Sequence, residues 1–182
     1  MKDDFINFLI KTSALQFGEF VTKSGRHTPY FINTGKLNTG ETLFSLAKFY
    51  AAKIKELALN FDILFGPAYK GIPLVSAVSI MLWLEQGINI KWCSDRKEVK
   101  DHGDIGKFLG AVPKENERVL IVEDVITAGT TFYQLVPMLQ ERLKVKILGA
   151  IVAVDREERG KKSNLSAKDK LKKELNLSIY PI

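Results

Sequence analysis

The sequence has 182 residues, of which 46% are hydrophobic and 26% charged, the composition of a globular protein with room for one well-packed core. Its net charge of +6 is compatible with nucleic acid, an anionic membrane or a phosphorylated small molecule as partner, and equally with a surface of solvated lysines. The single cysteine, Cys93, excludes a disulfide framework and a cysteine-rich metal site.

The first ten residues, MKDDFINFLI, carry acidic side chains and lack the apolar core of an export signal. Apolar runs elsewhere in the sequence stay shorter than the length needed to cross a membrane. Together with the lone thiol, these features predict a cytoplasmic location.

The spacing of apolar residues and the positions of turn residues predict the elements of the first half of the chain. They are a helix over 3–16, a pair of short strands within 17–37, a helix over 41–59, a short buried strand over 61–66 and a largely buried helix over 71–87. The strand over 61–66 ends at a Gly-Pro turn, which separates it from the helix that follows.

The second half continues the alternation of strands and helices. It is predicted to hold a strand over 88–94, a polar segment over 95–116, a strand over 118–124, a helix over 130–143, a strand over 145–156, a polar amphipathic helix over 167–175 and a final strand over 176–182. Pro137 is expected to kink the helix that contains it. The segment over 95–116 is long for a structureless loop, and such loops are usually functional lids or disordered.

Strands that alternate with helices favour an α/β fold, with a central, mostly parallel sheet flanked by helices. The near-continuous apolar runs ILFG, VLIV and ILGAIVAV are typical of strands that are covered on both faces. The sequence shows neither an internal repeat nor a low-complexity linker, so we expect a single domain.

The stretch VLIVEDVITAGTTF places two acids, Glu123 and Asp124, at the end of a buried strand. Ligands of open parallel sheets bind beyond the carboxyl ends of the strands, so both acids are expected to face a ligand. The turn TAGTT then opens a helix. The unpaired amides of a helix N-terminus, together with the hydroxyls of Thr127, Thr130 and Thr131, would form an anion cradle.

Acids beside an anion cradle repel an anion unless the same ligand also offers hydroxyl groups or a divalent cation to the carboxylates. A phosphorylated sugar, with or without magnesium, satisfies both halves of the stretch. The stretch is not a P-loop, because no Gly-Lys-Ser/Thr follows. The alternative is a plain strand, turn and helix whose threonines serve only as caps, although two adjacent acids at a strand end are costly to leave unused.

This stretch resembles the phosphoribosyl pyrophosphate (PRPP) signature of the type I phosphoribosyltransferases. Three further segments resemble the orotate phosphoribosyltransferases in order and spacing, and a fourth, VDREERG (154–160), continues the match. The three are FGEFVTKSGRHTPYFINTGKLNTG (17–40), LFGPAYKGIPL (64–74) and DRKEVKDHG (95–103). The resemblance covers nearly the whole chain.

The resemblance implies the type I phosphoribosyltransferase fold with a single domain over 1–182. A small hood would be built mainly from 1–40 with the C-terminal segment, and a PRPP-binding core would occupy about 41–160. The implied enzyme transfers ribose 5-phosphate from PRPP to orotate, which gives orotidine 5′-phosphate and pyrophosphate in pyrimidine (UMP) biosynthesis. Its implied cofactor is Mg2+, held mainly through PRPP rather than by metal ligands of the protein.

The resemblance also implies a homodimer in which a lid loop over 95–110 closes on the active site of the neighbouring subunit. The lid carries four potential cations within seven residues, a poor composition for a core and a suitable one for pyrophosphate: Arg96, Lys97, Lys100 and His102. On the residues alone, the segment could also be a solvated charge run. The implied catalytic residues are Lys100, Asp101 and Asp124.

By resemblance, PRPP contacts come from the lid, the acid pair and the segments around them. The implied PRPP-binding residues are Lys23, Tyr69, Lys70, Arg96, Lys97, Lys100, His102, Glu123, Asp124, Val125, Ile126, Thr127, Ala128, Gly129, Thr130 and Thr131. The implied orotate-binding residues are Lys23, Phe31, Ile32, Thr127 and Arg156. On the residues alone, Lys70 could be a surface lysine at a helix start and Phe31 a core residue.

The sequence departs from the family pattern at several positions. Glu123 stands where an aspartate is common, Ile32 replaces the second of two aromatic residues, and Ile105 replaces a small residue in the lid. Family members commonly continue into a further helix, whereas the sequence as given ends at Ile182. The resemblance further implies a cis peptide bond between Ala68 and Tyr69.

Two other functions are compatible with parts of the sequence. One is a phosphoribosyltransferase for a different base, such as a purine, against which stand Lys23, the YFIN segment and Arg156, which suit an anionic pyrimidine. The other is a regulator that keeps the PRPP fold and binds RNA or DNA. The lysines, however, concentrate in the lid and the late helix, and no separate nucleic-acid module is present in the sequence.

Overall fold

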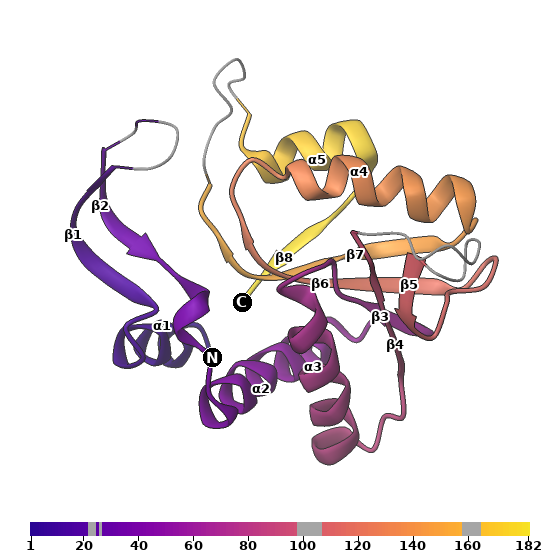
Figure 1. The fold of residues 1–182 in the computed structure, drawn as a ribbon, viewed down its shortest axis with the longest axis horizontal. Helices are drawn as coiled ribbons and strands as arrows, with labels where there is room; N and C mark the ends of the chain where they lie inside the picture. Colours follow the sequence, from indigo (N-terminus) through magenta and orange to yellow (C-terminus); the bar gives the residue numbers. More distant parts are fainter. Residues whose placement is uncertain (22–24, 26, 98–106, 158–164) are drawn as a thin grey trace.

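The computed structural model describes residues 1–21, 25, 27–97, 107–157 and 165–182. A two-stranded sheet lies beside a six-stranded sheet that has helices on both faces (Figure 1). The six strands follow the order β5-β4-β3-β6-β7-β8. They are β3 (Ile63–Phe65), β4 (Lys91–Asp95), β5 (Phe108–Gly110), β6 (Arg118–Ile126), β7 (Lys146–Asp155) and β8 (Ile179–Pro181).

The pairings in the large sheet are parallel except for the one between β4 and β5, which is antiparallel. This confirms the predicted α/β fold with a central, mostly parallel sheet. The acid pair lies within β6, which continues two residues beyond Asp124, so the predicted strand end at residue 124 was too early. The short strand β5 was not predicted, because three residues in a polar, glycine-bearing segment give no periodic signal.

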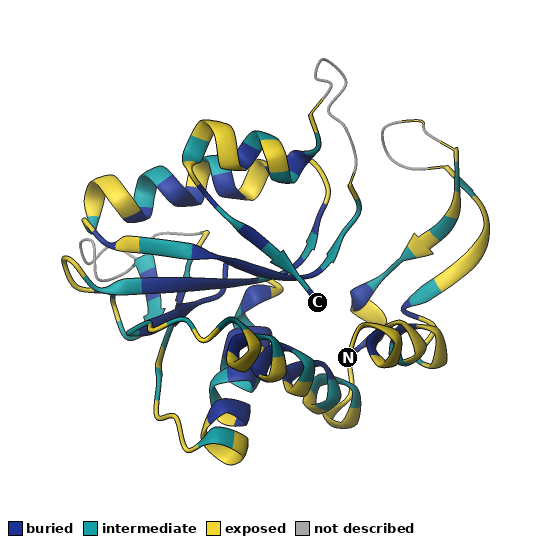
Figure 2. Cartoon of the chain, turned by 180° about the vertical axis from the view of Figure 1, so that it is seen from behind, coloured by how far each residue is buried: buried dark blue, intermediate teal, exposed yellow. Residues whose placement is uncertain are grey.

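Helices α2 (Gly40–Leu57) and α3 (Gly71–Gln86) pack on one face of the large sheet, and α4 (Thr130–Pro137) and α5 (Ala167–Leu175) pack on the other (Figure 1). Each face has its own buried cluster, with Leu64, Leu120 and Ile151 pointing toward α2 and α3. Ile121 and Val152 point toward α4 and α5, as the alternation of side chains along a strand requires. Figure 2 shows the buried strands enclosed between these two layers.

Pro137 is the last residue of α4, and a π-helical turn, η3 (Met138–Arg142), follows it directly. The regular helix is therefore shorter than the predicted 130–143. Proline has no N–H to donate, so a change of hydrogen-bonding pattern next to it is expected.

The first forty residues form α1 (Lys2–Lys11), the antiparallel hairpin of β1 (Leu15–Val21) and β2 (His27–Ile32), and the short 3-10 turn η1 (Thr34–Lys36). The predicted strand pair is thus confirmed. Helix α1 ends five residues earlier than predicted: Ser13 adopts a left-handed conformation and Leu15 pairs with Ile32 in the hairpin. Strand pairing here overrides a helical spacing that continues in the sequence.

The division into a hood over 1–40 with the C-terminal segment and a core over about 41–160 stays a prediction. The C-terminal strand β8 lies parallel to β7 at the edge of the large sheet. None of the helices in the described part of the chain is both long enough and apolar enough to cross a membrane.

Candidate active site

Asp124 lies near the C-terminal end of β6 and contacts two side chains from other elements. Its Oδ2 atom accepts a hydrogen bond from Thr34 Oγ1 at 2.5 Å and one from Lys70 Nζ at 2.7 Å. Lys70 Nζ also donates to Thr34 Oγ1 at 3.2 Å, which closes a three-membered ring of polar groups. Asp124 and Thr34 are both only 9% exposed, whereas the Lys70 side chain is 63% exposed, so the carboxylate and the hydroxyl are buried and the ammonium reaches them from the surface.

Glu123 is fixed by its backbone. The hydroxyl of Tyr50, a fully buried residue of α2, donates to the Glu123 carbonyl oxygen at 2.5 Å. The Glu123 carboxylate accepts from the backbone N–H of Asp124 at 2.9 Å. Burial, reinforced by the neighbouring Asp124 and Asp95 carboxylates, raises the pKa of Glu123 to about 7, although the Asp124 N–H and the Lys70 ammonium act in the opposite direction. Glu123 therefore titrates near neutral pH.

The raised pKa of Glu123 predicts a pH dependence of stability. Between pH 4.5 and 7 the folded chain keeps a proton on Glu123 that the unfolded chain has released, so the free energy of unfolding should fall as the pH rises through this window. Because a difference of one in pKa is worth about 1.4 kcal/mol, the titration of Glu123 should lower the free energy of unfolding by about 3 kcal/mol across this window. Denaturant unfolding at intervals across this window, with Glu123→Gln beside the unaltered chain, measures it. The glutamine variant should lose most of this slope.

Glu117 provides the control for this prediction. Burial raises its pKa, but hydrogen bonds from the Lys114 N–H and the Lys91 ammonium outweigh burial and leave the pKa lowered from 4.5. Its carboxylate is thus ionised in both states above about pH 5.5, so Glu117→Gln should change the free energy of unfolding by the same amount at every pH in the upper part of this window. A Glu123→Gln curve that runs parallel to that of the unaltered chain would contradict the raised pKa of Glu123.

The loop from Thr127 to Gly129 connects β6 to α4 and is built to present backbone amides. Gly129 has a φ of 71° and lies against Leu171, whose Cδ1 atom would be 2.9 Å from an added Cβ, so a larger residue would be both strained and crowded there. In the part of the chain that the structure describes, no side chain caps the first turn of α4. The amides and the exposed side chains of Thr130 and Thr131 are therefore open to an anionic ligand, whereas the Phe132 N–H donates to the Gly129 carbonyl at 3.0 Å.

A second loop, over 66–70, joins β3 to α3. Gly66 and Gly71 pack backbone against backbone, since a Cβ on Gly66 would lie 2.2 Å from the Gly71 carbonyl oxygen. The peptide bond between Ala68 and Tyr69 is cis, as predicted. The Ala68 N–H donates to Asp95 Oδ1, at the end of β4, at 2.7 Å. This loop brings Lys70 to Asp124 and leaves the Tyr69 ring exposed.

The two arms at the base of the predicted lid are paired. The Arg96 N–H donates to the Lys107 carbonyl at 2.7 Å and Arg96 Nε donates to the Phe108 carbonyl at 3.3 Å. The Lys97 ammonium lies over the Tyr69 ring, 5.4 Å from its centroid. The predicted catalytic residues Lys100 and Asp101 and the predicted ligands His102 and Lys23 lie outside the described residues.

A cavity of about 450 Å³ lies between α4 and the base of the predicted lid. Its lining joins three of the segments that the sequence predicts to bind PRPP: Ala68 of the 66–70 loop, Arg96 and Lys97 of the predicted lid, and Thr130 and Thr131 of α4. Lys107 and Arg142 add further positive charge. The acid pair, Lys70 and Arg156 are not part of this lining, so the cavity does not include the ring around Asp124.

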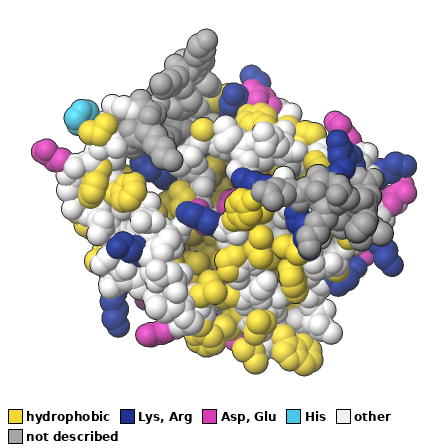
Figure 3. All heavy atoms as spheres, viewed as in Figure 1, with side chains coloured by type: hydrophobic (Ala, Val, Ile, Leu, Met, Phe, Trp, Pro, Cys, Tyr) yellow, Lys and Arg dark blue, Asp and Glu magenta, His cyan; other side chains and the backbone are white. Residues whose placement is uncertain are grey.

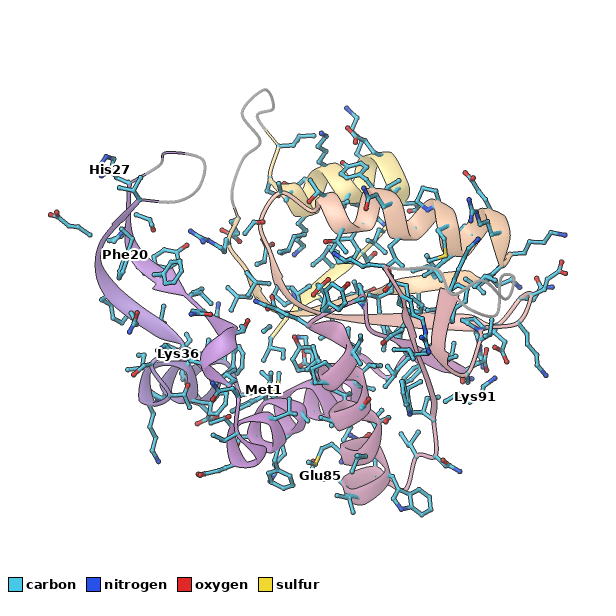
Figure 4. The ribbon with its side chains drawn as sticks, viewed as in Figure 1. Met1, Phe20, His27, Lys36, Glu85 and Lys91 are labelled. Carbon is cyan, nitrogen blue, oxygen red and sulfur yellow. The ribbon has the colours of Figure 1, made fainter. Side chains whose placement is uncertain are left out.

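Arg156 follows the end of β7 and faces the hairpin. Its guanidinium carbon lies 5.6 Å from the centroid of the Tyr30 ring on β2, and the backbone N–H of Arg156 donates to the Ile126 carbonyl at 3.3 Å. The neighbouring Phe31 stacks on Phe20 of β1, labelled in Figure 4, at a ring separation of 5.5 Å. Arg156 thus contacts the hairpin through Tyr30, the residue that precedes the Phe31–Ile32 segment.

Sequence reasoning missed three residues that shape the site. Tyr50 has the apolar spacing of an ordinary core residue, and only packing brings its hydroxyl to β6. Asp95 holds the 66–70 loop, and its position at a strand end was a signal that could have found it. Thr34 contacts Asp124 across ninety positions of sequence, and no local pattern points to it.

Comparisons with known proteins agree with this geometry. Residues 33–179 match the model of the phosphoribosyl transferase domain family. The chain is 53% identical, over all of its length and 81% of the relative's, to the orotate phosphoribosyltransferase of Clostridium acetobutylicum. It is 44% identical, over 98% of its length and 82% of the relative's, to that of Pseudomonas fluorescens. The crystal structure of the Francisella tularensis orotate phosphoribosyltransferase superimposes with a TM-score of 0.87 at 43% identity, covering 98% of this chain and 84% of that one.

The fold and the site define a phosphoribosyltransferase, and the chain belongs to that family. Within the family it is a member of the orotate phosphoribosyltransferases, pentosyltransferases of pyrimidine biosynthesis.

Proposed function

We propose that this chain transfers ribose 5-phosphate from PRPP to orotate, giving orotidine 5′-phosphate and pyrophosphate. The observation that carries the proposal is the ring of Asp124, Lys70 and Thr34, whose carboxylate lies in β6 shortly before the 127–131 loop. The ring places the Asp124 carboxylate beside the Lys70 ammonium. PRPP can offer its ribose hydroxyls to the carboxylate and its pyrophosphate group to the ammonium. The identity of the relatives over nearly the whole chain supports orotate as the acceptor.

In this reaction the bond between the ribose and pyrophosphate breaks while a ring nitrogen of orotate forms the new bond to the same carbon. The ribose becomes positively charged in between. We assign the 5-phosphate to the amides and hydroxyls of 127–131, and the ribose hydroxyls to Glu123 and Asp124. The buried negative charge of Asp124 then stabilises the cationic ribose, while the Lys70 ammonium beside it offsets the charge of the leaving pyrophosphate.

Arg156 and the hairpin supply the acceptor end of the site. The guanidinium suits the carboxylate of orotate, and its place against Tyr30 aims it toward the hairpin. The backbone of Phe31 and Ile32, together with Thr127 and Lys23, is assigned to the pyrimidine ring. Because the Phe31 ring stacks on Phe20, we assign recognition there to the backbone rather than to the ring.

Magnesium fits this site as an ion that is bound mainly by the phosphates of PRPP. Among the described residues, no three His, Cys, Asp or Glu side chains cluster closely enough to hold a metal ion. Asp124 and Asp95 already accept hydrogen bonds from Lys70 and from the Ala68 N–H. One carboxylate with substrate phosphates and water is the usual environment of Mg2+, and the ion would offset the charge of the leaving pyrophosphate.

We further propose a homodimer in which the 95–110 lid of each subunit closes on its neighbour's site. Helix α3 begins at the 66–70 loop and carries Ile80, Trp83 and Leu84, which are 58%, 58% and 64% exposed. Figure 3 shows hydrophobic side chains gathered over this part of the surface. A helix that is apolar on all sides is typically buried, so we assign its exposed face to a second copy of the chain.

A spectrophotometric assay tests the reaction directly. Loss of orotate absorbance is expected when PRPP and magnesium are present, and none when PRPP is left out. Consumption of adenine, hypoxanthine or uracil in place of orotate would sink the assignment of the acceptor. Tight RNA binding without consumption of any base would instead favour a regulator.

A further inference from the structure

The ring around Asp124 includes a residue that takes no part in the proposed chemistry. Thr34 belongs to η1, the short turn between the hairpin and α2. It is 9% exposed, and its hydroxyl reaches a carboxylate ninety positions away in the sequence. A buried hydroxyl that is hydrogen-bonded to a charged group of the site can influence how that group binds a ligand.

The direction of the hydrogen bonds in the ring follows from the chemistry of the donors. The Lys70 ammonium can only donate, so the Thr34 oxygen accepts from it at 3.2 Å. The hydroxyl proton of Thr34 must then point to Asp124, which can only accept when ionised. Thr34 thus bridges the two charges, and its hydroxyl has a single orientation.

Both polar contacts fall on the same oxygen of Asp124. Thr34 and Lys70 bind Oδ2, and within the described residues Oδ1 has no hydrogen-bond partner. Two donors on one oxygen fix the rotation of the carboxylate. The other oxygen, Oδ1, remains an acceptor whose direction is set by these two bonds.

The turn that carries Thr34 is itself rigid. The Asn33 side chain accepts from the Gly35 N–H at 3.0 Å, and the Leu37 N–H donates to the Thr34 carbonyl at 2.9 Å. The Asn33 N–H donates to the Ala14 carbonyl at 2.7 Å, which ties the turn to the start of the hairpin. The hydroxyl is therefore supplied from a preorganised position rather than from a free side chain.

We propose that Thr34 is a positioning residue that orients the Asp124 carboxylate, with Oδ2 held by Thr34 and Lys70 and Oδ1 presented to the ribose hydroxyls of PRPP. This inference rests on the proposed function and deepens it. Thr34 acts through Asp124 and contacts no reacting atom. Thr34, which lies outside the acid motif, thereby sets the orientation in which Asp124 binds the ribose.

Thr34→Val keeps the shape of the side chain and removes the donor. Because a hydrogen bond to a charged group is worth a factor of roughly 10 to 100, the variant should lose about that factor in kcat/KM for PRPP. Thr34→Ser restores the hydroxyl and should recover most of the loss. The KM for orotate should stay unchanged in both, since neither touches the acceptor end. Thr12→Val is the matched control: Thr12 follows α1, and its hydroxyl donates to the Phe8 carbonyl at 2.8 Å, outside the ring.

A double-variant cycle separates positioning from mere packing. Thr34 and Lys70 share one oxygen of Asp124, so the losses caused by Thr34→Val and Lys70→Met should be less than additive in the double variant. Additive losses, an unchanged or increased kcat/KM in Thr34→Val, or an equal loss in Thr34→Ser would overturn the proposal. Unfolding midpoints measured on the same proteins show whether any loss comes from the fold.

Calorimetric titration with PRPP distinguishes a failure of the role of Thr34 from a failure of the proposed reaction. If the unaltered chain binds PRPP but does not consume orotate, the proposed function fails, while weaker PRPP binding by Thr34→Val and recovery in Thr34→Ser still support the role of Thr34. If the valine variant binds PRPP as tightly as the unaltered chain and turns over normally, the role of Thr34 fails alone. Absence of PRPP binding to the unaltered chain would overturn both.

Discussion

Asp124→Asn is expected to lower kcat for orotate conversion by roughly 100-fold or more, the scale of losing one charge-stabilising group in an active site. Asparagine keeps the size of the side chain and can still accept from Thr34, so the change removes mainly the negative charge. That charge lies 2.7 Å from Lys70 in a buried position, where it is poorly screened by water. Initial rates at saturating PRPP, orotate and magnesium measure kcat.

Asp62→Asn is the matched control for this result. Asp62 is also ion-paired, to Arg118 at 2.7 Å, but its partner is the first residue of β6, at the end of the strand remote from the site. The variant should leave kcat unchanged even if it lowers the unfolding midpoint. A comparable drop in the control would mean that the loss reflects damage to β6, and a normal kcat in Asp124→Asn would remove Asp124 from the catalytic set.

Mixing two inactive variants is expected to restore turnover if the lid is shared between subunits. Lys100→Ala and Asp124→Ala should each lose most activity alone. In a mixed dimer one site combines an intact Asp124 with an intact Lys100 from the neighbour. After full exchange about a quarter of the original activity should return, because half of the dimers are mixed and each has one complete site.

Two observations make this experiment decisive. Differently tagged subunits, purified on both tags in turn, prove that mixed dimers were formed. Lys100→Ala mixed with a second lid variant, Asp101→Ala, serves as the comparison, since neither partner then supplies an intact lid and no activity should return. Mixed dimers of the first pair that stay inactive would argue that each lid closes on its own subunit.

The acid pair and its loop could be predicted from the sequence because their information is local. An apolar run, two acids, a glycine and three threonines follow one another within fourteen residues, and the strand and the helix around them are set by those same residues. The hairpin and the strands of the large sheet other than β5 could be predicted for the same reason. The extension of β6 beyond Asp124 could not, because it depends on pairing of Ile126 with Asp155 of β7.

The supports of the site escaped prediction because they are contacts between distant segments. Thr34 sits in a short turn with the composition of any turn, and its partner is known only once η1 and β6 are placed side by side. Tyr50 fits the apolar spacing of α2 so well that its hydroxyl carries no signal. At helix α1 a local pattern is overridden instead: the apolar spacing predicts a longer helix, but pairing in the hairpin ends the helix earlier.

Asp95 has a consequence for the timing of a catalytic cycle. The residue is both the end of the strand that leads into the predicted lid and the acceptor for the Ala68 N–H in the 66–70 loop. A displacement of that strand end would also move the loop, so the hydrogen bond couples the predicted lid to the loop that we assign to pyrophosphate. We therefore expect release of pyrophosphate and opening of the lid to occur as one event with a single rate, rather than as two successive steps.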